Sequence, residues 1–229
     1  LDNVDREEAK KRGVEVRNTP AASSVAVAEL AMALMIALPN HVVKGHNSMV
    51  EGKWIKKELK RDELMGKTLG LVGAGNIGTE LARRCIAFGM RVIAYDPLVK
   101  GHEGVDLVSI DELFAQSDYI SLHVPLTDET RGMINKETMG RMKDGVVIVN
   151  TARGRCVAEE DMVEALSSGK VRAYATDVWY SDPPDPSCPL YDAPNVVMTP
   201  HLGASTRENM LRIGDVVVRI LEDFVQRTA

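Results

Sequence analysis

The sequence predicts an α/β fold in which helices cover both faces of a parallel sheet, and two observations carry this prediction. Short apolar runs rich in Val, Ile and Leu alternate along the chain with amphipathic segments of helical length. The runs are apolar throughout rather than at every second residue, which is typical of strands buried on both faces of a parallel sheet. The chain has 229 residues, of which 45% are hydrophobic, enough for one large domain or for one domain and part of another.

The regular alternation of strands and helices begins at residue 68. The predicted strands cover residues 68–72, 91–95, 119–124, 146–150, 171–178 and 196–199. The predicted helices cover residues 76–88, 111–116, 136–142, 159–167 and 207–225. This order is that of a doubly wound sheet, in which helices connect parallel strands and lie on both faces.

The segment before residue 68 is less regular. We expect a short charged helix at 5–11, a brief strand at 14–17, a helix at 25–38 and a surface segment at 40–66. Ser24 is the predicted cap of the helix at 25–38, and Pro39 is its predicted end. Because this helix is apolar on most sides, burial in a domain core and burial in a subunit interface would explain it equally well.

Charge and cysteine content narrow the classes of function. The net charge is −5 with both signs interspersed, and no basic stripe indicates a nucleic-acid partner. The longest apolar stretch is too short to span a bilayer and no signal peptide is visible, so we expect no membrane partner. Three cysteines without metal-ligand spacing are typical of a reducing compartment, so we expect a cytoplasmic protein without a metal site.

A glycine-rich turn lies between the first core strand and its helix. Gly73, Gly75 and Gly78 form a G-x-G-x-x-G, in which the glycines allow a tight turn, approach of a pyrophosphate, and close helix–strand packing. The helix N-terminus then faces the phosphates, and Asp96, at the end of the next strand, can accept hydrogen bonds from the adenosine ribose. The pattern predicts a Rossmann-type dinucleotide site. A turn without ligand would leave Asp96 unexplained.

Polar residues follow four further predicted strand ends, where ligands bind in an open parallel sheet. His123, Arg153, Asp177 and His201 are the notable side chains. Arg153 has a planar fork suited to a carboxylate, and His201 can exchange a proton near neutral pH. Together with a carboxylate that orients the imidazole, these groups would serve the reduction of a 2-oxo acid by hydride. Taken singly, each residue has a structural explanation. Arg153 could be a surface ion-pair partner, His201 could be a helix cap, and His123 could be a core residue.

A series of motifs runs through essentially the whole chain. They are LDNVD, NTP…VAELAMAL, GLVGAGNIG, DP, HVPLTDETRGMIN, VIVNTARG, ATDV and MTPHLGAST. In this order they resemble the D-isomer-specific 2-hydroxyacid dehydrogenases, which include phosphoglycerate dehydrogenase and glyoxylate/hydroxypyruvate reductase. The resemblance implies an NAD-dependent oxidoreductase that interconverts a small-molecule 2-oxo acid and a D-2-hydroxy acid.

The resemblance also assigns roles to residues. Arg153 would orient the substrate carboxylate and carbonyl, His201 would give or take the proton, and Asp182 would be the partner of His201. The expected cofactor contacts are Gly73, Gly75, Asn76, Ile77, Gly78, Asp96, His123, Val124, Pro125, Thr151, Ala152, Arg153, Asp177, His201, Gly203 and Ala204. The resemblance further places the helix at 25–38 in a subunit interface, so we expect a homodimer.

The chain departs from the family in two places. The family usually has a glutamate where Asp182 precedes Pro183, and because aspartate is one methylene shorter, Asp185 is the alternative partner of His201. Family members also carry βα units before the LDNVD motif. Residues 1–18 would then be the remnant of a flavodoxin-like substrate domain, 19–204 the NAD-binding domain, and 205–229 a helix that returns to the substrate domain. The fragment alone would have little or no activity.

An alternative class shares this fold and these motifs. It is the NAD-binding regulatory or scaffold protein of the co-repressor type, with little or no turnover. Arg153 and His201 favour an enzyme, whereas the aspartate at position 182 and the missing start keep the alternative open. The sequence does not identify which 2-hydroxy acid would be the substrate.

Overall fold

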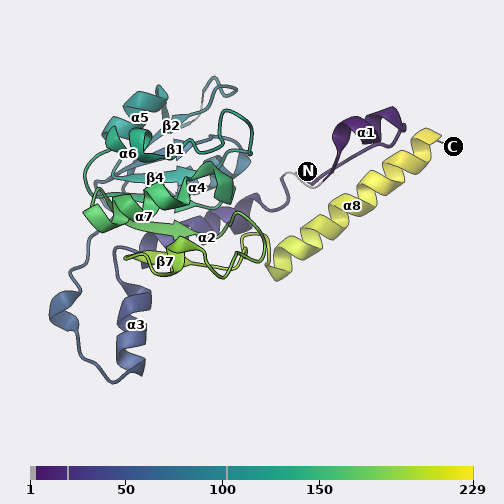
Figure 1. Ribbon diagram of the computed structural model, residues 1–229. Helices are drawn as coiled ribbons and strands as arrows, with labels where there is room; N and C mark the ends of the chain where they lie inside the picture. The colour runs from purple at the N-terminus through teal and green to yellow at the C-terminus, as the bar shows by residue number, and fades with distance from the viewer. Residues whose placement is uncertain (1–3, 20, 102, 229) are drawn as a thin grey trace.

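The computed structural model describes residues 4–19, 21–101 and 103–228 (Figure 1). The first three residues of the LDNVD motif, Pro20 of the NTP motif, His102 and Ala229 lie outside the described residues. Everything below refers to the described part of the chain.

Seven parallel strands form one sheet among the described residues, in the order β3-β2-β1-β4-β5-β6-β7. The strands are β1 (Thr68–Val72), β2 (Arg91–Tyr95), β3 (Asp106–Leu107), β4 (Tyr119–Leu122), β5 (Val146–Asn150), β6 (Val171–Thr176) and β7 (Val196–Met198). The strand order reverses between β1 and β4, which is the point where ligands bind in such sheets. The predicted doubly wound α/β fold is confirmed.

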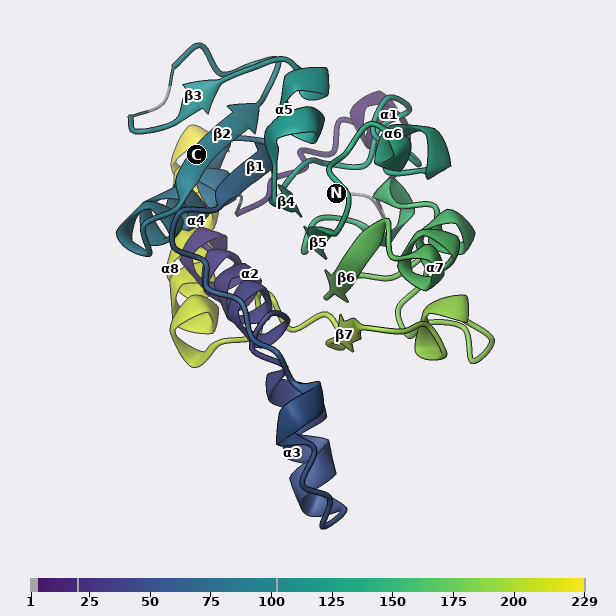
Figure 2. The same cartoon turned by 90° about the vertical axis from the view of Figure 1, so that its left-hand side faces the viewer.

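Helices cover both faces of the sheet, as Figure 2 shows. One face is covered by α2 (Ser24–Ala37) and α4 (Asn76–Ala87), and the other by α5 (Ile110–Gln116), α6 (Lys136–Gly140) and α7 (Glu159–Ser168). Along β5, Val147 and Val149 belong to the first core, whereas Val146 and Ile148 belong to the second. Because successive side chains point to opposite faces, a strand with two buried faces must be apolar throughout.

Several predictions for the segment before β1 need correction. No strand forms at 14–17, where Val14 is exposed and no described strand pairs with it. Ser24 does not cap α2, because the helix begins at Ser24 and its buried hydroxyl has no hydrogen-bond partner among the described residues. The segment at 40–66 contains a helix, α3 (Val42–Val50), whose Gly45 weakens the helical signal in the sequence.

The remaining elements match the prediction or differ by a few residues at one end. Helix α1 (Arg6–Lys11) is capped by Asp5, whose carboxylate accepts a hydrogen bond of 2.9 Å from the Glu8 N–H. Short 3₁₀ turns are η1 (Lys56–Glu58), η2 (Gly154–Cys156) and η3 (Pro189–Tyr191), and the last helix is α8 (Arg207–Thr228). The two-residue strand β3 is too short to give a sequence pattern.

The apolar helix α2 lies largely in the core of its own domain. Ala28, Ala31 and Met35 are fully buried against α4 and the sheet. The domain core therefore accounts for most of its apolar surface, and a subunit interface is not needed to explain it.

No single described helix is long and apolar enough to cross a membrane. Only α2 and α3 taken together, with a bend of 65° between them, have the necessary length and composition.

Two parts of the chain extend away from the sheet. Helix α3 and the loop after it form one projection (Figures 1 and 2), and α8 extends away from the sheet as the other (Figure 1). The Arg227 guanidinium reaches the Glu15 carboxylate at 3.2 Å, which joins the two terminal segments. The division into residues 1–18, 19–204 and 205–229 stays a prediction.

Candidate cofactor and active site

The glycine turn after β1 has the shape that a pyrophosphate requires. Gly73 has φ +99°, and a Cβ there would lie 2.6 Å from the His123 carbonyl oxygen, so only glycine fits. A Cβ on Gly78 would lie 2.4 Å from the Gly73 carbonyl oxygen, so helix α4 packs directly on the turn. A Cβ on Gly75 would meet nothing within 4 Å. This space at the N-terminus of α4 fits a dinucleotide phosphate.

The Asp96 carboxylate is tied to the same turn. Its Oδ2 accepts a hydrogen bond of 2.8 Å from the Ala74 N–H, and its Oδ1 accepts one of 2.9 Å from the Leu98 N–H. Each oxygen has a second lone pair and can still accept a bond from a ribose hydroxyl. Asp96 therefore joins the predicted ribose site to the glycine turn, a second role that the sequence pattern did not suggest.

Two buried polar atoms without partners mark the ends of the neighbouring strands β4 and β5. They are Nδ1 of His123 and Oγ1 of Thr151, neither of which has a hydrogen-bond partner among the described residues. The other ring nitrogen of His123 lies 2.9 Å from the Ser121 hydroxyl oxygen. Burial lowers the pKa of His123 from 6.5 to about 4, so its imidazole is neutral at physiological pH. Unpartnered buried polar groups are uncommon and fit a site that is completed by a ligand.

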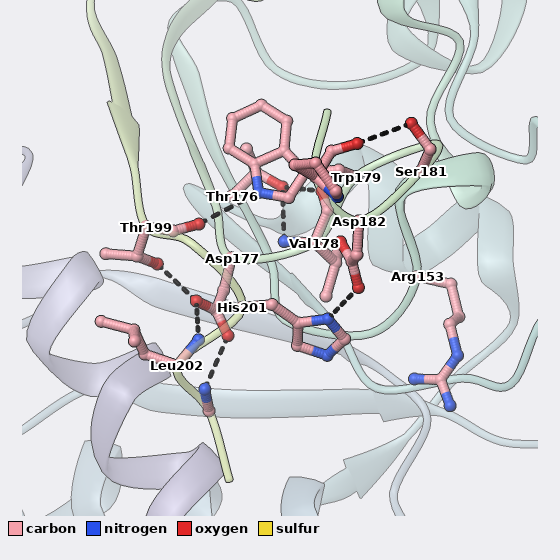
Figure 3. Close-up of polar contacts among 12 residues, drawn as sticks. Arg153, Thr176, Asp177, Val178, Trp179, Ser181, Asp182, Thr199, His201 and Leu202 are labelled. Atoms are coloured by element: carbon pink, nitrogen blue, oxygen red, sulfur yellow. Dashed lines mark hydrogen bonds and ion pairs between the residues drawn. The ribbon is translucent and has the colours of Figure 1, made fainter. Parts of the chain in front are cut away.

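The segment that carries Arg153 is shaped by Asn150 at the end of β5. The Asn150 amide oxygen accepts a hydrogen bond of 3.0 Å from the Ala152 N–H, and its amide nitrogen donates one of 2.9 Å to the Arg153 carbonyl. The Arg153 guanidinium is half-buried and donates a bond of 2.6 Å to the Ala152 carbonyl. In Figure 3 this guanidinium and the His201 ring extend toward the same side of the loops that carry them.

His201 and Asp182 are in contact. His201 Nδ1 lies 2.5 Å from Asp182 Oδ2, and both side chains are about half exposed. They line a cavity of about 400 Å³ with Trp179, Ala204 and three prolines, Pro183, Pro184 and Pro200. The shorter aspartate therefore reaches the histidine. Asp185 instead accepts two hydrogen bonds from Ser187, one from its N–H and one from its hydroxyl, so it is not the partner.

Asp177 holds the segment that contains His201. Its carboxylate is 1% exposed. Oδ1 accepts bonds of 2.6 Å from the Thr199 hydroxyl and 2.7 Å from the Leu202 N–H, and Oδ2 accepts one of 2.8 Å from the Gly203 N–H (Figure 3). The sequence placed Asp177 beside the cofactor and gave Thr199 no role. These contacts join positions 22 to 26 residues apart, for which the sequence offers no local signal.

The other predicted cofactor residues lie along the same carboxyl edge of the sheet. Asn76 and Ile77 open helix α4, Val124 and Pro125 follow β4, and Ala204 lies after His201.

A second cavity, of about 570 Å³, lies between α3 and strands β5 to β7, and none of the predicted site residues lines it. Among the described residues, no group of three or more His, Cys, Asp or Glu side chains could hold a metal ion.

Comparison with known proteins gives a consistent match. Residues 32–203 match the sequence model of the D-isomer specific 2-hydroxyacid dehydrogenase, NAD binding domain. A hydroxypyruvate reductase from Thermotoga maritima is 52% identical over 227 residues, which cover 97% of this chain and 74% of that protein. A D-3-phosphoglycerate dehydrogenase from Archaeoglobus fulgidus is 45% identical over 229 residues, which cover 98% of this chain. This chain spans only 43% of the length of that relative.

The fold is also found in solved structures. One is an NAD-dependent formate dehydrogenase from Staphylococcus aureus in complex with NAD. It superposes with a TM-score of 0.92 at 37% identity, over 100% of this chain and 70% of that chain. The likeness therefore includes the whole described fold.

Proposed function

Because the chain belongs to the D-isomer specific 2-hydroxyacid dehydrogenases, a family of NAD-dependent oxidoreductases, we propose that it interconverts a 2-oxo acid and a D-2-hydroxy acid. The observation that carries the proposal is the contact between His201 and Asp182. This contact and Arg153 both lie on the carboxyl side of the sheet. Hydride reduction of a carbonyl needs a proton donor for the new alkoxide and a cation that binds the acid, and these residues supply both.

The proton would pass through His201. Its Nδ1–H donates to Asp182, which leaves Nε2 as the nitrogen that exchanges a proton with the substrate oxygen. In reduction, Nε2–H would protonate the developing alkoxide, and in oxidation neutral Nε2 would remove the hydroxyl proton. Asp182 would fix the ring orientation and stabilise the imidazolium. The Arg153 guanidinium would bind the substrate carboxylate and polarise the carbonyl.

NAD supplies the hydride acceptor or donor when bound. The glycine turn at Gly73, Gly75 and Gly78 would hold its pyrophosphate, and Asp96 its adenosine ribose. A carboxylate at this position repels the 2′-phosphate of NADP, so we expect NAD to be preferred. The unpartnered buried atoms, Nδ1 of His123 and Oγ1 of Thr151, would lie beside the nicotinamide half of the cofactor.

We further propose a cytoplasmic homodimer. Support comes from α3 and the loop after it, where the apolar side chains of Val42, Val50 and Trp54 are 54%, 73% and 76% exposed. An exposed apolar projection of this kind is typical of a subunit contact. Sedimentation of the full-length protein at tens of micromolar is the test, and a monomer at that concentration would contradict the dimer.

A substrate panel with the full-length protein tests the proposed reaction. The panel starts with hydroxypyruvate, glyoxylate and pyruvate, follows NADH absorbance, and analyses the product on a chiral column. We expect turnover of at least one 2-oxo acid with a D-configured product. Tight NADH binding without turnover of any acid would contradict the proposal and favour the co-repressor type of protein. An L-configured product would contradict the proposed D configuration of the hydroxy acid.

A further inference from the structure

Trp179 lies at the centre of the site, yet the reaction outlined above gives it no role. It is half-buried, follows Asp177 by two residues, and precedes Asp182 by three. Its ring lines the cavity beside His201 and lies 6.0 Å, centroid to centroid, from the Tyr191 ring. Packing alone would explain those two contacts, but two others connect Trp179 to both proposed catalytic groups.

The first connection runs to the segment that carries His201. The indole Nε1–H of Trp179 donates a hydrogen bond of 3.1 Å to the Thr199 carbonyl, two residues before His201 (Figure 3). His201 itself has φ +54°, a conformation that costs a non-glycine residue free energy and persists only when the surrounding structure holds it. Asp177 holds this segment on both sides of His201. The indole adds a second bond from the loop of Asp182, besides the contact of Asp182 with His201 itself.

The second connection runs to the segment that carries Arg153. Gly154 follows Arg153 directly, and a Cβ on Gly154 would lie 2.2 Å from the Trp179 carbonyl carbon and 2.7 Å from its Cα. The two backbones are therefore in contact with no space between them. The next residue, Tyr180, adds a hydrogen bond of 2.8 Å from its hydroxyl to the Val157 carbonyl.

We propose that Trp179 is a positioning residue that sets the placement of His201 relative to Arg153. Its backbone packs on the arginine segment, and its indole N–H holds the histidine segment. The inference rests on the proposed reaction, in which the substrate must touch both side chains at once. Reaction rates depend steeply on such placement, because a misplacement of about 1 Å can cost about a hundredfold in rate.

The test is Trp179→Phe in the full-length protein, which keeps an aromatic ring against Tyr191 but lacks the N–H donor. Trp54→Phe is the matched control, because Trp54 is 76% exposed in the loop after α3 and phenylalanine keeps an apolar ring at the proposed subunit contact. Hydrogen–deuterium exchange of the peptide covering residues 199–203 is the first readout and needs no activity. We expect about threefold faster exchange there in Trp179→Phe, with unchanged exchange in β1 and α4 and no change in Trp54→Phe.

Steady-state kinetics with NADH and hydroxypyruvate are the second readout. We expect kcat to fall by about tenfold in Trp179→Phe while KM for NADH stays within about twofold of wild type. Exchange at residues 199–203 equal to wild type would overturn the inference, as would faster exchange spread evenly over the whole domain. If the wild type turns over no 2-oxo acid, the proposed reaction fails, whereas the exchange result still decides whether Trp179 holds the His201 segment.

If Trp179→Phe does not fold, the hydrogen bond can be removed with a smaller change. In the Trp54→Phe background Trp179 is the one tryptophan left among the 229 residues, and replacing tryptophan by 3-benzothienylalanine exchanges its indole N–H for sulfur and keeps the bicyclic shape. The same rise in exchange at residues 199–203 is expected. Exchange there equal to that of the Trp54→Phe protein would overturn the inference.

Discussion

The buried histidine at the end of β4 should make the stability of the protein depend on pH in a defined window. Burial lowers the pKa of His123 from 6.5 to about 4, so the unfolded chain takes up a proton between these values while the folded chain does not. The contribution of His123 to stability is therefore complete above pH 6.5 and is lost as the pH falls toward 4.

The size of the effect follows from the pKa difference. A difference between 6.5 and about 4 corresponds to about 3 kcal/mol below both values, and to about 2 kcal/mol at pH 5. His123 as a whole residue is only half-buried, but its Nδ1 has no access to solvent, and both ring nitrogens of the protonated imidazole carry a hydrogen, so the charged ring would have a buried N–H without a partner there. About 2 kcal/mol at pH 5 is therefore the upper limit of the effect.

The assay is urea unfolding without cofactor at several pH values between 7.5 and 5, for the wild type and for His123→Gln. Other groups titrate in both proteins, so the difference between their curves isolates His123. From pH 7.5 to pH 5 the free energy of unfolding should fall by up to about 2 kcal/mol more in the wild type than in the variant. His46→Gln, which removes an exposed imidazole from α3, should follow the wild type. Parallel curves for wild type and His123→Gln down to pH 5 would refute the reasoning.

Two further predictions concern the cofactor and the partner of His201. Asp96→Ala should raise the Kd for NADH by about tenfold or more and the Kd for NADPH much less, because the variant loses acceptors for the ribose but also loses a charge that repels the 2′-phosphate. Fluorescence titration with both cofactors measures these Kd values. An equal loss of affinity for both would contradict the assignment. Asp96→Asn keeps one acceptor oxygen for the Ala74 N–H and should have a smaller effect. Asp182→Asn should lower kcat by about tenfold or more, and a loss of about 10⁴-fold is the upper reference, from neutralising the carboxylate of a catalytic triad. Asp185→Asn should leave kcat within about twofold. A larger effect at Asp185 would mean that His201 changes partner in the working enzyme.

The central strands and the glycine turn could be predicted because their signals are local. In β5 the four residues before Asn150 are all apolar. Gly73 needs glycine for its positive φ and Gly78 for its close approach to the turn, and both requirements arise within one βαβ unit. Segments without such signals were missed. Helix α3 contains a glycine and lysine among its apolar residues, and β3 is two residues long.

The contacts that build the site are of a different kind. The residues themselves pointed to Asp177 and His201 as separate positions at strand ends, and the resemblance gave Asp182 as the expected partner of His201 with Asp185 as the alternative. That Asp177 accepts three hydrogen bonds from residues 199–203, and that Trp179 reaches Thr199, depends on how two loops pack against each other. Pairing between distant loops has no periodicity in the sequence, so only the structure could select Asp182 over Asp185.

The most direct test of the proposed reaction is the comparison of His201→Gln with the wild type in the full-length protein. It measures kcat for reduction of hydroxypyruvate and, by fluorescence titration, the Kd for NADH. Loss of proton transfer should lower kcat by about 10²- to 10⁴-fold, while the Kd for NADH stays within about threefold because the glycine turn and Asp96 are untouched. A His201→Gln enzyme that turns over at the wild-type rate would contradict the account.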